Sequence, residues 1–150
     1  MTLSYQQRTI LPISNAVAQH GFRSGFESRV ASELTAENIT FEYETEKIAY
    51  IRPERRSAYN PDIIIRVKPD GTPKNKVLYC ELKGRFLTAD RQKHLLIRSQ
   101  HGFDYDVRFV FQNPSAKIAK KSKTTYAMWC DKHNFKYAKN HIPQEWLEED

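Results

Sequence analysis

Two acidic residues and a lysine are spaced so that a pair of β-strands would bring them together. Asp62 opens the apolar run 63–65, while Glu81 and Lys83 come at the end of a second apolar run, 77–82. Side chains alternate between the two faces of a strand, so Glu81 and Lys83 point the same way. If the two runs pair as a hairpin, Asp62 comes alongside them, and two carboxylates and an amine share one edge of a sheet.

This combination of side chains suits the hydrolysis of a phosphodiester. Two carboxylates can hold Mg²⁺ or Mn²⁺ against a phosphate group, and a lysine can orient or deprotonate the attacking water. The pattern therefore indicates a metal-dependent nuclease. Pro-Asp and Glu-x-Lys are both common, however, and an Asp after Pro is often a turn residue, so the surrounding sequence has to support this interpretation.

Composition and charge agree with a polyanionic partner. The chain has 150 residues, which indicates one domain, and its 24 basic and 18 acidic residues give a net charge of +6. No apolar stretch has the length of a transmembrane helix, and the N-terminus lacks the features of a signal peptide. The two cysteines form no disulfide framework. We expect an intracellular protein that does not bind membranes.

The first helix should begin at Ser24. Ser24 and Glu27 have the spacing of a capping box, and Phe26, Val30 and Leu34 then mark one apolar face at helical spacing. A capping box favours glutamate at this position in any protein. Glu27 therefore has an ordinary structural explanation beside a functional one.

The remaining pattern predicts a mixed α/β domain in which helices cover a hairpin-rich sheet. Alternating apolar and charged residues predict a long, half-exposed strand over 39–50, followed by a basic connector over 51–60. The further elements are expected as strands at 63–67 and 77–82, a helix from Thr88 to about Gln100, a strand at 107–111, a helix from Thr124 or Thr125, a strand at 135–138 and a short helix after Pro143.

The helix expected at 88–100 carries several basic residues. Arg91, Lys93 and Arg98 could form its solvated face, which is the usual meaning of such charges, or they could contact phosphate groups near the Glu-x-Lys strand. His94 is expected to touch solvent or phosphate rather than a metal ion.

Read together, these segments resemble the endonuclease I family of T-odd bacteriophages, which are Holliday-junction resolving enzymes. The resemblance extends over most of the chain and is densest in six segments, namely Phe22–Glu27, Phe41–Glu44, Pro61-Asp62, Glu81–Gly84, Asp90–His101 and Ile142–Trp146. Together these segments are far more specific than the Asp…Glu-x-Lys pattern alone.

The resemblance implies a restriction-endonuclease-like core of order α-β-β-β-α-β, with a mixed sheet flanked by helices. Residues 1–21 would form an N-terminal arm and residues 22–150 the endonuclease domain. The resemblance also implies an intertwined homodimer, in which residues 39–60 would bridge the two catalytic domains.

The same resemblance implies roles for individual residues. Asp62 and Glu81 would bind Mg²⁺ (or Mn²⁺), and Lys83 would be the catalytic lysine. Glu27 would be a further catalytic and metal-binding carboxylate, which in the family comes from the other subunit. We also expect basic residues to contact DNA, namely Arg23, Arg91, Lys93, His94 and Arg98.

The expected function is that of a Mg²⁺-dependent DNA endonuclease in the cytoplasm of a phage-infected bacterium. It would cut branched DNA, foremost four-way junctions, by paired nicks that leave a 5′-phosphate and a 3′-hydroxyl. Two departures bear on junction specificity, because residues 68–76 look like an inserted hairpin tip and the chain ends on the acidic residues 148–150. Lys68, Lys74 and Lys76 in the tip could contact DNA or only decorate a loop.

Two alternatives stay open. A site-specific, homing-type endonuclease could use the inserted tip to read base edges in a groove. A non-catalytic DNA-binding protein is the other alternative. It has no need for Asp62, Glu81 and Lys83 as a group, because carboxylates that face phosphate repel DNA unless a metal ion intervenes.

Overall fold

The computed structural model describes residues 22–52 and 55–150. The arm expected at residues 1–21 lies outside the described residues. The described part contains four helices and seven strands, in the order α3 (Gly25–Ala36), β1 (Glu42–Tyr43), β2 (Ile48–Arg52), β3 (Arg55–Tyr59), β4 (Ile63–Val67), β5 (Pro73–Lys83), α4 (Thr88–His101), β6 (Asp106–Phe111), α5 (Tyr126–Lys132), β7 (Tyr137–Lys139) and α6 (Gln144–Glu148).

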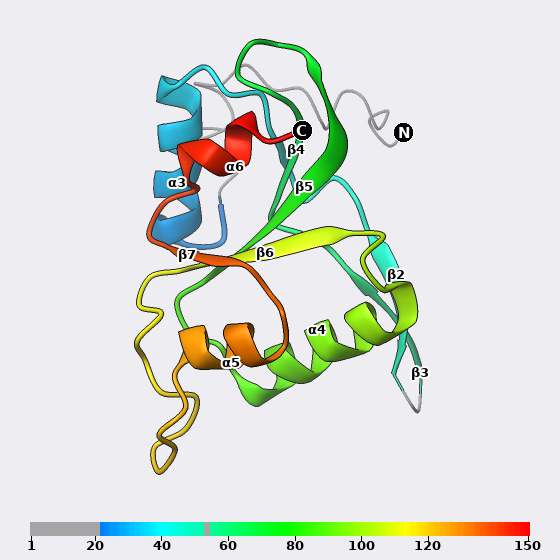
Figure 1. Cartoon of the computed structure of the whole chain (residues 1–150), viewed down its shortest axis with the longest axis vertical. Coiled ribbons are helices and arrows are strands. Elements are labelled where there is room, and N and C mark those ends of the chain that lie inside the picture. The colour runs from blue at the N-terminus through cyan, green and yellow to red at the C-terminus, as the bar shows by residue number, and fades with distance from the viewer. Residues whose placement is uncertain (1–21, 53–54) are drawn as a thin grey trace.

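Five strands form a mixed sheet with the order β1-β4-β5-β6-β7 (Figure 1). The pairs β1–β4 and β4–β5 are antiparallel, whereas β5–β6 and β6–β7 are parallel. Strands β2 and β3 form a separate antiparallel hairpin. The prediction of a mixed α/β domain is confirmed. The central strand, β5, is also the strand that carries the Glu-x-Lys motif.

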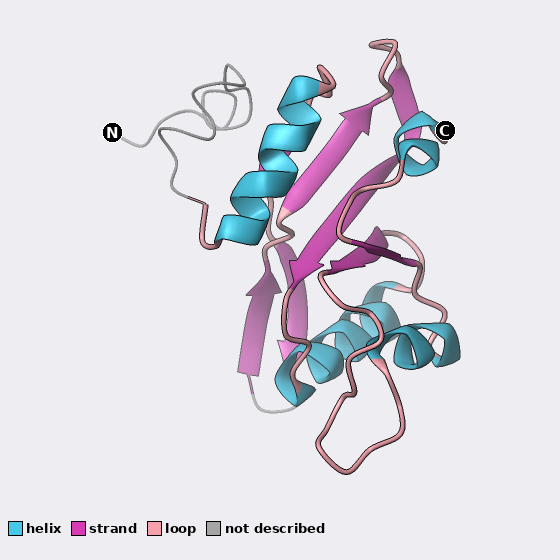
Figure 2. Cartoon of the chain, turned by 90° about the vertical axis from the view of Figure 1, so that its left-hand side faces the viewer, coloured by secondary structure: helices cyan, strands magenta, loops and turns pink. Residues whose placement is uncertain are grey.

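Alternation along β5 divides the core between the two faces of the sheet. Leu78, Cys80 and Leu82 belong to a buried apolar cluster that includes residues of α3 and α6. Tyr79 belongs to a second cluster, with residues of the β2–β3 hairpin and α4. Figure 2 shows α3 and the pair α4–α5 as separate layers of the molecule. Glu81, which lies between Cys80 and Leu82, therefore faces the hairpin and α4.

The N-terminal end of α3 forms half of the expected capping box. The side chain of Ser24 accepts a hydrogen bond of 3.1 Å from the amide of Glu27. The Glu27 carboxylate instead accepts a 3.1 Å hydrogen bond from the hydroxyl group of Tyr43. Phe26, Val30 and Leu34 are buried, as their spacing predicts.

The prediction of one long strand over 39–50 is wrong. This segment contains two short strands, β1 and β2, which belong to different sheets. The chain changes direction at Glu44, whose φ of 51° is incompatible with an extended strand. The basic connector expected over 51–60 is also more regular than predicted, because most of it forms β3 and pairs with β2.

The expected hairpin tip is shorter than residues 68–76, because β5 already begins at Pro73. Asp70 accepts hydrogen bonds from the amide and hydroxyl groups of Thr72, and Gly71 supplies a positive φ of 87° for the turn. Lys74 is buried and its ammonium group donates to backbone carbonyls at the C-terminal end of the chain. Lys74 is therefore a packing residue and does not decorate a loop.

The later elements agree with the sequence apart from their ends. The N-cap of α4 is Leu87, not Thr88, and its amide donates to Asp90 Oδ2. Thr125 caps α5 as expected. Strand β7 begins two residues later than predicted, since the side chain of Phe135 is drawn into the aromatic core. Among the described residues, no helix has the length and apolarity needed to cross a bilayer.

Candidate active site

Antiparallel pairing of β4 and β5 brings Asp62 beside the Glu-x-Lys motif. Ile63 pairs with Cys80, so Asp62 lies one residue beyond this pair, at the level of the motif. Asp62 Oδ2 accepts a 2.8 Å hydrogen bond from the amide of Leu82, which lies between Glu81 and Lys83. The geometric part of the sequence prediction is confirmed.

Lys83 lies between two carboxylates. Its Nζ atom is 2.9 Å from Asp90 Oδ1 and 3.4 Å from Glu81 Oε2. Burial disfavours the charged form of Lys83, but Glu81 and Asp90 stabilise it more strongly, so its pKa is raised. Lys83 is therefore an ammonium ion at neutral pH. It can donate a hydrogen bond and supply positive charge.

Glu81 lies next to groups from two other elements, of which one donates a hydrogen bond to it. Its Oε1 atom accepts a 3.0 Å hydrogen bond from the hydroxyl group of Tyr59, at the end of β3. His94 of α4 is fully buried, with its Nε2 atom 3.9 Å from Glu81 Oε2. Burial raises the pKa of Glu81, but the effects of His94 and Lys83 outweigh burial, so the pKa is lowered overall. Glu81 therefore carries negative charge in the core of the domain.

Asp62 lies in an environment that opposes its ionisation. Its side chain is buried, and both this burial and the nearby charge of Glu81 raise the pKa of Asp62 well above its ordinary range. Concentrated negative charge in a buried place is costly unless a cation neutralises it. A divalent cation would remove that cost.

A group of three carboxylates fits such a cation. Glu27, Glu44 and Asp62 each offer a ligand atom, and these atoms all lie within 4.8 Å of one another. Carboxylate oxygens are the donors that Mg²⁺ and Mn²⁺ prefer. The structure describes one chain, and within it the three carboxylates come from the start of α3, the residue after β1 and the residue before β4.

Glu44 and Tyr59 are site residues that the sequence reasoning missed. Glu44 was placed within a regular strand, although it lies next to Tyr43 in one of the segments that carry the family resemblance. Its carboxylate is 2.9 Å from the guanidinium group of Arg23. Tyr59 was placed in a connector, and its contact with Glu81 depends on the β2–β3 hairpin, which no local signal predicted.

Glu27, Tyr59, Asp62, Glu81 and Lys83 line one cleft of about 400 Å³. Two of the expected DNA-contacting residues, Arg23 and Lys93, lie at this cleft. The lining residues are Arg23, Glu27, Ala58, Tyr59, Asn60, Asp62, Glu81, Leu82, Lys83 and Lys93.

Three other residues expected to contact DNA lie elsewhere. The guanidinium group of Arg91 is buried and donates to Phe86 O, so Arg91 fixes the start of α4. His94 is only 1% exposed and has no surface to offer DNA. Arg98 covers the ring of Phe135, with 4.0 Å between its Cζ atom and the ring centroid. Arg91 and His94 are therefore buried within the domain, and Arg98 lies outside the cleft.

Comparison with known proteins identifies the group to which this chain is related. The sequence model of the family described as "Phage endonuclease I" matches residues 11–150. The chain belongs to the phage endonuclease I family. This confirms the family that the sequence motifs indicated.

Two relatives illustrate how similar the members of the phage endonuclease I family are to this chain. "Endonuclease I" of Escherichia phage T7 is 41% identical over 128 residues, which make up 85% of this chain and 79% of the relative. "Endodeoxyribonuclease 1" of Enterobacteria phage T3 is 39% identical over 128 residues, or 85% of this chain and 78% of the relative.

Proposed function

We propose that this chain is a DNA endonuclease that depends on Mg²⁺ or Mn²⁺ and cuts branched DNA, foremost four-way junctions. The observation that carries the proposal is the meeting of buried carboxylates and the Lys83 ammonium group in one cleft, in a member of a family of endonucleases. The carboxylates of this cleft would repel the phosphate backbone of DNA unless a cation lay between the carboxylates and the phosphate.

Asp62, Glu81 and Glu27 would hold the cation, and Glu44, whose carboxylate lies close to those of Glu27 and Asp62, would add a further ligand. When bound, the cation neutralises charge on the scissile phosphate and lowers the pKa of a water ligand. Tyr59 and His94 would keep the Glu81 carboxylate in position. Such supporting contacts commonly matter for metal affinity nearly as much as the ligands do.

Lys83 would act as a fixed positive charge. Its ammonium group can donate to a phosphate oxygen and stabilise the negative charge that develops as the phosphodiester is attacked. Asp90 and Glu81 hold this group in place before DNA binds. Arg23 and Lys93, at the same cleft, would contact phosphates that flank the scissile one. The expected products carry a 5′-phosphate and a 3′-hydroxyl.

We extend the proposal to the assembly. A homodimer would present two such sites, so both strands of a junction could be cut in one encounter. Residues 22–150 would form the endonuclease domain on a restriction-endonuclease-like core, with residues 1–21 as an arm. Residues 39–60, which include the β2–β3 hairpin, would form the bridge. The enzyme would act in the cytoplasm of the infected host cell.

The homing-type alternative would use the hairpin tip to read base edges in a DNA groove. The lysines of that segment offer little support for such contacts. Lys74 is instead buried, and the Nζ atom of Lys68 lies 2.6 Å from Asp150 Oδ1. Of the three lysines considered for that role, Lys76 alone is exposed and free of a described ion pair.

The test is a comparison of two labelled DNA substrates incubated with the purified protein and Mg²⁺. One is an immobile four-way junction, the other is a long linear duplex of the same base composition, and Lys83→Ala serves as the control. We expect paired nicks in the junction that the control does not make. Cleavage of the duplex at one defined sequence would favour the homing-type enzyme, and no cleavage of either would favour a binding protein.

A further inference from the structure

A projecting loop between β6 and α5 concentrates positive charge away from the cleft. We call residues 115–124 the lysine finger. All four of its lysines are exposed, and the chain has no acidic residue between Asp106 and Asp131. These lysines are Lys117, Lys120, Lys121 and Lys123.

The base of the lysine finger is structured. Lys117 forms an isolated antiparallel bridge with Thr125, and the amide of Ile118 donates a 2.9 Å hydrogen bond to Thr124 O. Ala116 and Ile118 pack against the aromatic cluster beneath β6 and α5. The two arms of the finger are therefore paired, and a packed base supports the exposed lysines.

The lysine finger begins beside β5, the strand that carries Glu81 and Lys83. Lys83 of β5 pairs with Phe111 of β6, and the next residue, Gln112, donates its amide to Lys83 O at 3.1 Å. Figures 1 and 2 both show the loop extending from there past α4 and α5, away from the main sheet. Lys120 is the eighth residue after Gln112, so the Cα atoms of the two residues are at most about 28 Å apart. That limit corresponds to about 8 base pairs of duplex.

The charge of the finger is not neutralised by ion pairs within residues 22–52 and 55–150. None of its four lysines forms an ion pair with any residue that the structure describes. Several other basic side chains do have acidic partners within 4 Å, namely Arg23 with Glu44, Arg29 with Glu33, Arg66 with Glu42 and Glu46, Lys68 with Asp150, and Arg108 with Asp106 and Glu149. The finger thus presents four exposed lysines within ten consecutive residues, unpaired in the part of the chain that the structure describes.

We propose that the lysine finger binds the phosphate groups of a duplex arm outside the active-site cleft. The inference rests on the proposed function for its choice of DNA as the partner. A strand that places a phosphate at Lys83 has its neighbouring duplex within reach of the finger. Flexible lysines on an exposed loop suit phosphates, which offer charge and no sequence information. The finger therefore adds affinity and orients the arm, and takes no part in the chemical step.

The experiment measures DNA binding in the Lys83→Ala background, so that cleavage cannot interfere. In the finger variant, Lys117, Lys120, Lys121 and Lys123 are all replaced by Gln. Affinity for a junction with arms of about 20 base pairs is measured from about 50 to 200 mM salt. Each phosphate contact contributes about 0.9 to the slope of log K against log[salt]. With all four lysines on phosphates, we expect the slope to become shallower by about 3.6, with affinity reduced on the order of 10³-fold or more at 0.1 M salt.

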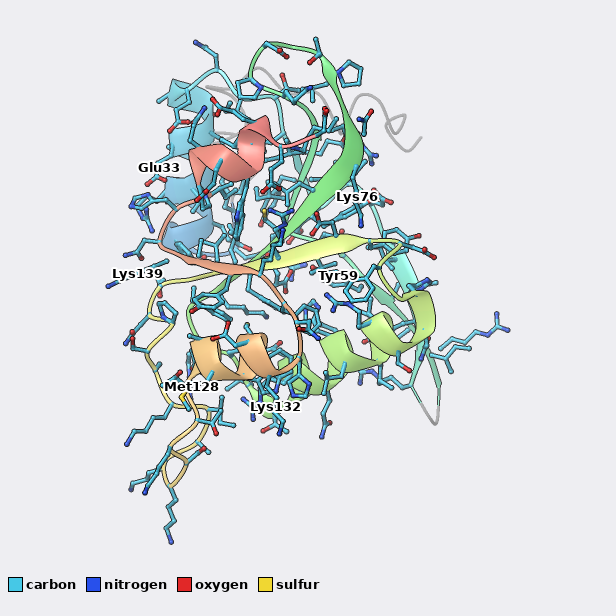
Figure 3. The ribbon with its side chains drawn as sticks, in the orientation of Figure 1. Glu33, Tyr59, Lys76, Met128, Lys132 and Lys139 are labelled. Atoms are coloured by element: carbon cyan, nitrogen blue, oxygen red, sulfur yellow. The ribbon has the colours of Figure 1, made fainter. Side chains whose placement is uncertain are left out.

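Single substitutions supply the matched control. Lys120→Gln should make the slope shallower by about 1. Lys76→Gln removes the same charge from an exposed position on β5, remote from the finger (Figure 3), and should leave the slope unchanged. Equal effects of the two substitutions would mean that only net charge matters, and an unchanged slope in the fourfold variant would mean that the finger does not touch DNA. Either result overturns the proposal.

Phosphate ethylation interference locates the contact. In the parent protein, ethylation of phosphates outside the cleavage site but within about 8 base pairs of it should weaken binding, by the reach of the loop. The fourfold variant should lose this sensitivity and keep that at the cleavage site. Retained sensitivity at the outer phosphates overturns the proposal. These readouts concern binding alone, so a protein that proves unable to cut junctions would refute the proposed function without deciding the role of the finger.

Discussion

The hydroxyl group of Tyr59 donates a 3.0 Å hydrogen bond to Glu81 Oε1. Tyr59 ends β3, in the two-stranded hairpin, whereas Glu81 lies in the central strand of the main sheet. The bond therefore joins two separately formed sheets at a buried carboxylate. His94 lies near the other carboxylate oxygen of Glu81, Oε2, and its ring packs edge-on against the ring of Tyr59. The position of a proposed catalytic carboxylate depends on how the hairpin docks.

Tyr59→Phe should raise the Mg²⁺ concentration that cleavage requires, with little loss of folding stability. The ring that fills the core remains, and a lost hydrogen bond costs about 0.5–1.5 kcal/mol. Loss of a group that orients a ligand commonly costs about 10–100-fold in metal affinity or activity. We expect the Mg²⁺ concentration for half-maximal cleavage to rise by about tenfold or more.

Tyr50→Phe is the matched control for this prediction. Tyr50 is buried in the same hairpin, but its hydroxyl group accepts hydrogen bonds from Arg52 and does not contact Glu81. Its Mg²⁺ dependence should equal that of the parent protein. If both substitutions change the Mg²⁺ dependence alike, the effect comes from the hairpin as a whole and Tyr59 does not position Glu81.

Lys83→Gln should abolish catalysis and preserve DNA binding. The raised pKa of Lys83 means that it acts as a cation, and removal of one group that stabilises developing charge commonly costs about 10²–10³-fold in rate. Single-turnover cleavage of a junction measures this loss, and binding to the same junction should change by no more than about twofold. Lys83→Arg keeps the charge and should retain more activity than Lys83→Gln. Equal activities of the Gln and Arg variants would contradict the role of the charge.

Asp62→Asn should stabilise the metal-free protein at neutral pH while it abolishes cleavage. The pKa of Asp62 is raised in the folded state, first by burial and then by Glu81, so the folded protein binds this proton more tightly than the unfolded chain. The contribution of Asp62 to stability therefore falls as pH rises above its unfolded value, which is about 3.9. Asn is uncharged at every pH and keeps an oxygen that can accept from the Leu82 amide.

Thermal unfolding in EDTA measures this effect. The melting temperature of Asp62→Asn should exceed that of the parent protein at pH 8, and the difference should narrow as the pH falls towards 4. Added Mg²⁺ should raise the melting temperature of the parent protein by mass action and affect the variant much less. If the variant is less stable than the parent protein at pH 8, burial and the charge of Glu81 do not destabilise the ionised form of Asp62.

The strands that carry the motif could be predicted because their signals are local. Alternation places Glu81 and Lys83 on one face, and a turn between two apolar runs brings Asp62 beside them. The β2–β3 hairpin could not be predicted in the same way. Its position depends on a reversal at Glu44, where a residue other than glycine adopts a positive φ, and no sequence pattern marks that conformation.

The burial of the basic residues on α4 could not be predicted for a related reason. Arg91 and His94 share a helical face with Ile97, at spacings of three residues, and this face is the buried one. Charge suggested a solvated surface, but the Arg91 guanidinium group is satisfied by a backbone carbonyl and His94 packs among aromatic rings. Only tertiary structure reveals such partners for buried polar groups.

Lys74 provides a test of whether the segment after the hairpin tip serves structure or DNA. Its ammonium group donates to Trp146 O at 3.0 Å, to Leu147 O at 3.4 Å and to Glu149 O, and so it ties β5 to α6. Lys74→Met keeps the aliphatic part of the side chain and removes these bonds. Loss of a buried charged donor costs about 1–3 kcal/mol, which lowers the melting temperature of a domain of this size by about 3–10 °C.

Lys76→Met is the matched control, because Lys76 is exposed two residues further along the same strand. An exposed substitution should change stability by no more than about 0.5 kcal/mol. For Lys74→Met, the salt dependence of junction binding should equal that of the parent protein below the melting transition, since a buried ammonium group does not meet phosphate. A shallower salt slope with an unchanged melting temperature would reverse this assignment and make Lys74 a DNA contact.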